Sequence, residues 1–449
     1  MQDIIAAFND LAASRADLAE ESQALLNDTL IPRRLHFGQR PLATVLRPHF
    51  LTPDEYRYIR QEMRLLLGAF ARVYARLMAD SAFRAQMDLT PEEEDVIQID
   101  PGYKTPTPTG RMDTFFIHGG TLHCVEYNAE TPAATAYEDV LSDAFLNLPL
   151  LSEFGKRYYI QPLAGRWQLV GVLRDLWAEA GGRGRPQIAI VDWDTVPTYA
   201  EFELWQEYFA EHGYKAIITT PEACEYRNGH LYSGDFRIDV IYKRVLGSEL
   251  LEKYGVNHPI IHALRDHAVV MFNPFRCKLL HKKVSFALLS DDANHALFTT
   301  EQLHAIQEHI PWTRKVAEMK TTWEGREIDL IPHILAAKDN LVLKPNDEYG
   351  GKGVVIGWET TPSEWEAAVQ EGLRSSYVVQ TKVNIAREDY PSWSDGGVVV
   401  GERLVDLDPF LWRGEYAQGA LTRLSAQTLL NVTAGTGSTV PTLLISPRD

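Results

Sequence analysis

The sequence predicts an α/β protein, because strand and helix patterns alternate in its middle third. The run PQIAIVDWD (186–194) is typical of a buried strand, YAEFELWQEYFAEHG (199–213) of a helix, and YKAIITT (214–220) of a second strand. We predict one further strand over FRIDVIYKR (236–244). Strand–helix–strand spacing indicates a parallel sheet with crossover helices, so we assign an α/β domain to residues 151–275.

Length and composition set the frame for the rest of the chain. The protein has 449 residues, of which 45% are hydrophobic and 23% charged, which is ordinary for a globular protein with two or three domains. The net charge is -17, and no basic stripe stands out. This argues against nucleic acid as the main partner and leaves small molecules as the expected ones.

The cysteines and the N-terminal residues bear on location. Cys124, Cys224 and Cys277 lie far apart without a CxxC spacing, which indicates neither a zinc site nor disulfides and fits a reducing compartment. The first residues lack the basic and apolar regions of a signal peptide. No apolar run approaches the roughly 18 residues of a membrane helix. We expect a cytoplasmic protein without a membrane partner.

Residues 1–104 are predicted to be a helical N-terminal region. Thr52-Pro53-Asp54-Glu55 has the features of a capped helix start, and helical apolar spacing continues to residue 78. Residues 105–150 and 276–449 form the remaining units, the first a strand hairpin and the second mixed. Thr361-Pro362-Ser363-Glu364 predicts another capped helix. We expect short strands at the end of the chain.

A hairpin is predicted within GRMDTFFIHGGTLHCVEYNAETP (110–132). A two-residue Gly119-Gly120 loop would place His118 opposite Thr121. The same register sets Asp113 opposite Glu126 and Arg111 opposite Asn128, all on one face. The other face would carry Met112, Thr114, Val125 and Tyr127.

Two carboxylates directly opposite each other repel, unless a cation lies between them. Mg²⁺ is the simplest candidate, since it prefers oxygen ligands from one or two carboxylates together with phosphates. Asn128 would add a neutral oxygen, and the Arg111 guanidinium suits a transferring phosphoryl group. The alternative is a solvated hairpin face that carries two acids by chance.

A second motif is LVLKPNDEYGGKGVVIGW (341–358). We predict a strand at 341–344, a glycine-rich turn and a strand at 354–358, which is not the strand–loop–helix of a P-loop. Glycines let backbone N–H groups approach phosphate oxygens, and Lys344 would supply a positive charge. The alternative is an ordinary hairpin with a surface lysine.

Two further segments are less specific. Arg276, Lys278, Lys282 and Lys283 form a basic cluster in an acidic chain, for which a solvated helix face is the default interpretation. The β-rich run SSYVVQTKVN (375–384) contains Gln380. It could be an edge whose backbone binds an adenine, or an ordinary core strand.

Together these motifs resemble the circularly permuted branch of the ATP-grasp superfamily, which includes the synthetase domain of glutathionylspermidine synthase. The resemblance runs from about residue 105 to the end of the chain. It is carried by R-x-D, EYNAETP, HKKV, IPWTR, VLKP with GGKG, and NVTAGTGSTVP. The acidic segment precedes the lysines, as in the permuted branch.

The resemblance implies a circularly permuted ATP-grasp fold with an α/β pre-ATP-grasp domain, and ATP and Mg²⁺ as cofactors. The implied roles are magnesium binding by Asp113, Glu126 and Asn128; support of an acyl-phosphate step by Arg111; phosphate binding by Lys283, Lys344 and the loop glycines Gly350, Gly351 and Gly353; adenine binding by Gln380, Lys382 and Val383; and phosphate or substrate binding by Arg423. The implied function is an ADP-forming carboxylate–amine ligase that makes an amide bond through an acyl-phosphate.

Lys282 departs from the asparagine usual in the glutathionylspermidine branch, and the glycine loop carries Asp347-Glu348. Glutathione and spermidine are therefore not inferred as substrates. Two alternatives stay open, namely a phosphotransferase without ligation and a non-catalytic nucleotide-binding protein. A Rossmann dehydrogenase is excluded, since no GxGxxG follows an early strand.

Substrate contacts are expected where open α/β sheets bind ligands, beyond the carboxyl ends of strands. The candidates are Asp192, Asp194, Thr198, Glu201 and the run Tyr242-Lys243-Arg244. A capped helix start or surface residues would explain the same pattern.

Overall fold

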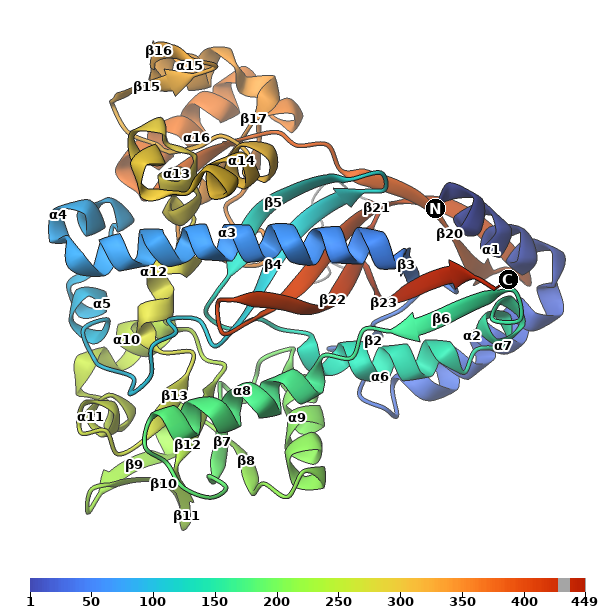
Figure 1. Ribbon diagram of the computed structural model, residues 1–449, viewed down its shortest axis with the longest axis horizontal. Coiled ribbons are helices and arrows are strands. Elements are labelled where there is room, and N and C mark those ends of the chain that lie inside the picture. The colour runs from blue at the N-terminus through green and yellow to red at the C-terminus, as the bar shows by residue number, and fades with distance from the viewer. Residues whose placement is uncertain (427–436, 449) are drawn as a thin grey trace.

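The structure is a computed structural model that describes residues 1–426 and 437–448. Figure 1 shows a mixed α/β architecture in which one large sheet occupies the centre. A parallel sheet with its helices lies on one side of it, and a third sheet with its helices lies on the other. Residues 431–436 of the NVTAGTGSTVP motif lie outside the described residues.

Within the described residues the large sheet has eight strands, and it joins segments from both ends of the chain. The path β3-β23-β22-β21-β4-β5 is antiparallel except for the β3–β23 pair; β20 pairs with β21, and β6 with β23. The bounds are β3 (His49–Leu51), β23 (Ser438–Pro447), β22 (Tyr416–Ser425), β21 (Gly397–Trp412), β4 (Thr109–Ile117), β5 (Thr121–Asn128), β20 (Ala386–Ser394) and β6 (Tyr158–Pro162). The expectation of short C-terminal strands is wrong, since β21 to β23 are long.

The β4–β5 hairpin confirms the pairs Asp113–Glu126 and Arg111–Asn128, although the turn differs from the predicted one. Ile117 pairs with Thr121, so the turn has three residues, and both of its glycines have positive φ. A bulge next to Asp113 then restores the expected register farther from the turn. The predicted placement of Val125 is corrected by the same bulge, since Val125 and Glu126 line one cavity.

Helix α3 (Pro53–Ala79) covers one face of this hairpin. Thr52 caps it, and Glu55 completes the predicted capping box. Residues such as Met63 and Phe70 on its buried face pack in one core with Met112 and Tyr127 of the hairpin. Because strand side chains alternate, Arg111 and Asp113 project away from that core.

A buried ion cluster fixes the hairpin turn. His118 lies between two carboxylates, 2.8 Å from Glu55 Oε1 and 3.1 Å from Glu388 Oε1. Arg47 holds the other oxygen of Glu388 at 2.8 Å. Burial opposes the charge of His118, but the bonds to Glu388 and Glu55 outweigh it and raise the pKa of His118 to about 9.

This cluster predicts a pH-dependent stability. The folded pKa of about 9 exceeds the ordinary value of 6.5, so the ion pairs stabilise the fold fully below pH 6.5 and are lost as the pH rises through 9. The shift corresponds to roughly 3 kcal/mol. Urea unfolding of the protein and of His118→Gln should differ most near pH 6 and converge above pH 9. A difference independent of pH would show that His118 is not charged in the folded protein.

The parallel sheet confirms the α/β prediction for the middle of the chain. Its order is β13-β12-β7-β8, with β13 (Val270–Phe272), β12 (Val240–Lys243), β7 (Ile188–Val191) and β8 (Ala216–Thr219), all parallel. Helices α8 (Arg166–Glu179), α9 (Tyr199–Glu211), α10 (Gly247–Tyr254) and α11 (Pro259–Arg265) accompany these strands. Successive residues of β7 enter two different cores, so both faces of this sheet are buried.

The run FRIDVIYKR forms two strands, whereas one was predicted. β11 (Phe236–Ile238) belongs to a small antiparallel sheet, and β12 to the parallel one. The break is at Asp239, whose carboxylate accepts a bond from the backbone N–H of Gln187 at 2.9 Å and pairs with Arg237 at 3.2 Å. A polar group that turns toward these partners ends one strand and starts the next.

The third sheet has the order β14-β19-β17-β18, with β14 (Thr313–Lys315), β19 (Tyr377–Thr381), β17 (Leu341–Pro345) and β18 (Val355–Ile356). Helix α16 (Pro362–Arg374) starts at Thr361 with the predicted capping box. Trp365 of this helix packs with Leu341 and Leu343. The interpretation of β19 as an edge strand is wrong, because β19 pairs on both sides.

Two further findings concern the cysteines and the length of the helices. Cys124, Cys224 and Cys277 are buried and form no disulfide. None of the helices in the described residues combines the length and the apolar composition needed to cross a bilayer.

Candidate nucleotide and metal site

A cavity of about 220 Å³ lies between the β4–β5 hairpin and the third sheet. Its lining includes every metal- and nucleotide-binding residue that the resemblance implies, except Gly353. These residues are Arg111, Asp113, Glu126, Asn128, Lys283, Lys344, Gly350, Gly351, Gln380, Lys382, Val383 and Arg423. Gly353 has a φ of +72°, and a Cβ there would meet Pro345 at 2.7 Å, which makes it a turn glycine beside the cavity.

Asp113 is bound on all sides. Arg111 donates to both of its oxygens, at 2.8 and 3.1 Å, and Arg423 reaches Oδ2 at 2.7 Å. The amide N–H of Asn128 donates to Oδ1 at 2.8 Å. Burial opposes ionisation, but Arg111 and Arg423 outweigh it and lower the pKa of Asp113. Asp113 is therefore an anion in the folded protein.

Asp406 and Asp408 of β21 belong to the same cluster, and the sequence reasoning missed both. Arg423 pairs with Asp406 and lies 2.9 Å from Asp408 Oδ2, without hydrogen-bond geometry in the latter contact. Burial raises the pKa of both acids. The signal available in the sequence was D-x-D in an apolar strand, since such acids share a buried face.

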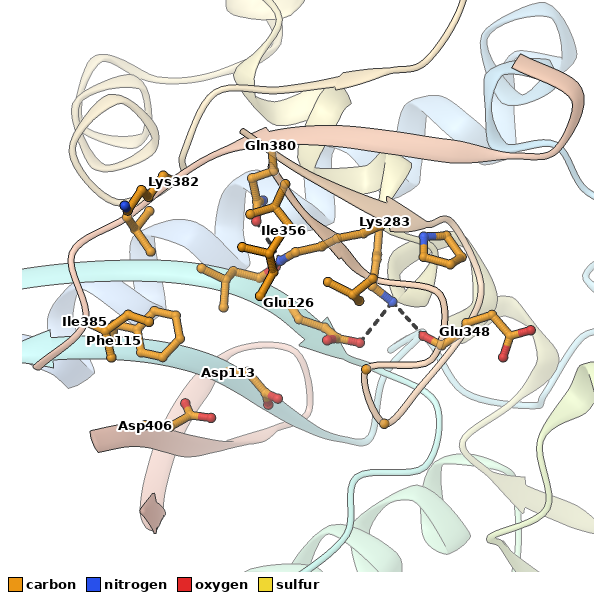
Figure 2. Close-up of a pocket in the computed structure, with 18 of the residues that line it drawn as sticks. Asp113, Phe115, Glu126, Lys283, Glu348, Ile356, Gln380, Lys382, Ile385 and Asp406 are labelled. Atoms are coloured by element: carbon orange, nitrogen blue, oxygen red, sulfur yellow. Dashed lines mark hydrogen bonds and ion pairs between the residues drawn. The ribbon is translucent and has the colours of Figure 1, made fainter. Parts of the chain in front are cut away.

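Glu126 and Lys283 form the next layer of the site, as Figure 2 shows. Lys283 Nζ lies 3.1 Å from Glu126 Oε1 and donates to the backbone oxygen of Glu348 at 2.7 Å. Burial opposes ionisation of Glu126, but Lys283 outweighs it and lowers the pKa of this carboxyl. Lys283 thus connects the acidic hairpin to the glycine-rich loop.

Lys344 of β17 lines the same cavity. It donates to Gln380 Oε1 at 2.7 Å and to the backbone oxygen of Val125 at 3.2 Å. Gln380 in turn donates to Thr313 Oγ1 at 3.0 Å, which fixes the direction of its amide. Burial lowers the pKa of Lys344 to about 8, against the opposing influence of Glu126. An anionic ligand would favour its charged form.

The basic cluster is buried, so the solvated-face interpretation is wrong for Lys278, Lys282 and Lys283. Lys278 pairs with Asp347 at 2.8 Å and with Glu130 at 2.9 Å. Asp347 thus links the glycine-rich loop to residues 278–283. Glu130 of the EYNAETP motif also pairs with Lys243 at 2.9 Å, so this carboxylate holds two lysines in place.

The end of the cavity away from the acids is mostly apolar. Val342, Ile356 and Trp358 line it from the third sheet, and Phe115 and Ile385 line it from the other side. Lys382 lies over the Trp358 ring at 4.1 Å from its centroid. An apolar slot beside charged groups suits a flat ring attached to a polyanion.

The donor set fits a hard divalent cation. Asp113, Asp406 and Asp408 offer carboxylate oxygens within 4.8 Å of one another, and Glu126 lines the same cavity. Oδ1 of Asp406 is buried and has no hydrogen-bond partner among the described residues. Oxygen donors of this kind, with the neutral oxygen of Asn128, are those that Mg²⁺ prefers.

No protein-family model matches the chain. Two proteins provisionally named glutamate–cysteine ligase 2 are similar to it, both from Frankia. The one from Frankia casuarinae is 25% identical over 337 residues, 71% of this chain and 36% of that protein. The one from Frankia alni is 25% identical over 212 residues, 45% of this chain and 23% of that protein. The chain thus spans about a third or less of these relatives.

A glutathione synthetase-like effector from Globodera pallida shares the fold. Its structure matches with a TM-score of 0.60 and covers 95% of this chain and 96% of its own, at 13% sequence identity. This likeness concerns the fold alone. The relatives and the shared fold support the resemblance to ATP-grasp ligases that the motifs indicated.

Proposed function

We propose that this chain, which resembles the ATP-grasp ligases in its motifs and its fold, is an ADP-forming carboxylate–amine ligase that uses ATP and Mg²⁺. The observation that carries the proposal is a single cavity in which acids, two lysines and an apolar slot meet. Lys283 and Lys344 would bind the phosphates, and the slot beside Gln380, Lys382 and Val383 would bind the adenine. A purely structural role of the acids would not require an apolar slot beside them.

The proposed reaction has two steps. A substrate carboxylate attacks the terminal phosphate of ATP, which gives an acyl-phosphate and ADP. An amine then attacks the acyl carbon, the amide bond forms, and phosphate leaves. Arg111 and Arg423 would stabilise the oxygens on which negative charge develops, and the loop at 347–353 would exclude water. Mg²⁺, held by Asp113, Glu126 and Asn128 beside Asp406, would offset the charge of the phosphates.

The proposal includes the permuted order of the ATP-grasp segments and a cytoplasmic location. The acidic hairpin at 109–128 precedes Lys283 and Lys344 in the chain, which supports the permuted order. A phosphotransferase would use the same residues on the nucleotide side. Its product would distinguish it from a ligase, because the substrate would be phosphorylated and no amine would be consumed.

The test is ATP turnover with Mg²⁺ across a panel of amino acids, short peptides and polyamines, scored for ADP, phosphate and condensed product by mass. We expect ADP only when a carboxylate and an amine are both present, with a product lighter than their sum by one water. A phosphorylated product without amine consumption would favour the phosphotransferase. Tight nucleotide binding without turnover on any pair would favour the non-catalytic alternative.

Replacing Lys344 should weaken nucleotide binding. Lys344→Ala removes a partly buried positive charge from the proposed phosphate site, and a hydrogen bond to a charged group contributes roughly 1.5–3 kcal/mol. We therefore expect the affinity for ATP, measured by calorimetry with Mg²⁺, to fall about 10- to 100-fold. Lys320→Ala, at an exposed position of the same part of the chain, is the control. Unchanged affinity in Lys344→Ala would remove this residue from the phosphate site.

A further inference from the structure

A second cavity, of about 440 Å³, adjoins the first. The two share Arg111, Asn128, Gly350 and Arg423 as lining residues, so a ligand in one lies next to a ligand in the other. The volume is in the range of roughly 300–1,000 Å³ typical of small-molecule sites. One end of this cavity is formed where β7 and β12 of the parallel sheet end, the usual place for a ligand in an open α/β sheet.

Arg244 lies at that end with an unused hydrogen-bond donor. The residue is 6% exposed and lines the cavity. One terminal nitrogen donates to the backbone oxygen of Pro132, and the other lies 3.8 Å from Glu201 Oε2. Nε has no hydrogen-bond partner among the described residues. A guanidinium with a donor left over suits a carboxylate ligand, which it can bind with two parallel bonds.

Asp192 is the neighbour of Arg244 across the sheet. Val191 pairs with Lys243, and the backbone N–H of Arg244 donates to the oxygen of Val191 at 2.9 Å. Asp192 is 8% exposed, lines the same cavity, and accepts a bond from the backbone N–H of Trp193 at 2.8 Å. Burial raises the pKa of Asp192 to about 6, which a bound cation would reverse.

A second acid strengthens the negative side of this end. Glu249 of α10 lines the cavity and accepts a bond from Trp193 Nε1 at 2.8 Å. The hydroxyl of Tyr349, at the tip of the glycine-rich loop, lies 3.4 Å from the other carboxylate oxygen of Glu249. The remaining wall is largely apolar. It includes Phe37, Leu42, Tyr137, Val196, Leu246 and Leu421.

We infer that the second cavity binds an α-amino acid with an apolar side chain as one of the two substrates of the ligase. Arg244 binds its carboxylate, Asp192 its ammonium group, and the apolar wall its side chain. Asp192 and Arg244 follow paired strands that lie about 4.8 Å apart, so one small zwitterion at the strand ends can reach both side chains. The role of this amino acid as a substrate rests on the proposed function, whereas its binding in the second cavity does not.

Binding is tested by calorimetry with five L-amino acids, namely alanine, valine, leucine, methionine and phenylalanine. Each is compared with its amide, which lacks the carboxylate, and its N-acetyl form, which lacks the ammonium group. Titrations are run with and without Mg²⁺ and a non-hydrolysable ATP analogue. We expect at least one free amino acid to bind, and both derivatives to bind at least about 10-fold more weakly. Binding of none of the five, or equal binding of the derivatives, overturns the inference.

Variants separate the two ends of the ligand. Asp192→Asn keeps the shape of the side chain and should abolish the preference over the N-acetyl form while it keeps the preference over the amide. Arg244→Met should do the reverse. Because Arg244→Met leaves Glu201 without its cation, thermal melting checks its fold, and Asp192→Asn decides the inference if that variant unfolds. Arg174→Met, at an exposed site on α8, is the matched control.

The two proposals fail in different ways. If the ATP analogue does not bind, the proposed function fails, and the titrations without nucleotide still decide what the second cavity binds. If the analogue binds but no amino acid does in either condition, the inference fails and the nucleotide site stands. The affinity for the analogue should be unchanged in Asp192→Asn, since Asp192 does not line the first cavity.

Discussion

Glu126→Gln should abolish ATP turnover while the protein stays folded. The substitution removes one negative charge from the proposed magnesium site but keeps the size of the side chain, and Lys283 retains its bond to the backbone of Glu348. Loss of a group that stabilises transition-state charge costs about 100- to 1,000-fold or more in rate. Phosphate release under saturating ATP and Mg²⁺ measures the loss, and circular dichroism monitors the fold.

The matched control for this change is Glu366→Gln on the exposed side of α16. It removes one negative charge from the same part of the chain without contact to either cavity, so its turnover should equal that of the unmodified protein. A fully active Glu126→Gln enzyme would show that the assignment of Glu126 to the metal site is wrong. Loss of turnover together with loss of the fold would instead assign Glu126 a structural role.

Arg423→Met should destabilise the fold more than any other single change near the site. Arg423 contacts three buried carboxylates, those of Asp113, Asp406 and Asp408, and Asp408 is 0% exposed. Removal of one partner of a buried ion pair costs about 3–5 kcal/mol, because the remaining charge is left without compensation. Urea unfolding at pH 7 should show a loss of this size.

A second substitution tests the cause of that loss. Arg423→Met combined with Asp408→Asn should recover part of the stability, since one of the uncompensated carboxylates is then neutral. The exposed pair of Arg387 with Glu402 provides the control, and Arg387→Met should change stability by less than about 1 kcal/mol. A loss of the same size in Arg387→Met would mean that the burial of the charges around Arg423 is irrelevant.

The sequence predicted the parts of the fold that local physics determines. The capping boxes at Thr52 and Thr361 start helices where they were expected, because a capping box satisfies the first backbone N–H groups of a helix within a few residues. The pairing of Asp113 with Glu126 was also predicted correctly, because two differences between the predicted and the observed hairpin cancel. A turn one residue longer shifts the register, and a bulge next to Asp113 shifts it back.

Long-range features were not predictable from one sequence. β3, near residue 50, joins β23 at the other end of the chain, and nothing local indicates that pairing. Asp406 and Asp408 join the site because β21 pairs with both β4 and β22. The burial of Lys278 was not predictable either, since its partners Glu130 and Asp347 lie far away in the sequence. Burial of a charge depends on such partners.

In the proposed reaction a substrate carboxylate attacks the terminal phosphate of ATP, and the transfer of a carboxylate oxygen to phosphate is the direct test of this step. The carboxylate substrate found with the panel is labelled with oxygen-18 in both carboxyl oxygens, and the released phosphate is analysed by mass spectrometry. An acyl-phosphate pathway transfers one labelled oxygen to each phosphate, and the amide product retains the other. Phosphate without label, or label in AMP, would rule out an acyl-phosphate made from ATP with release of ADP.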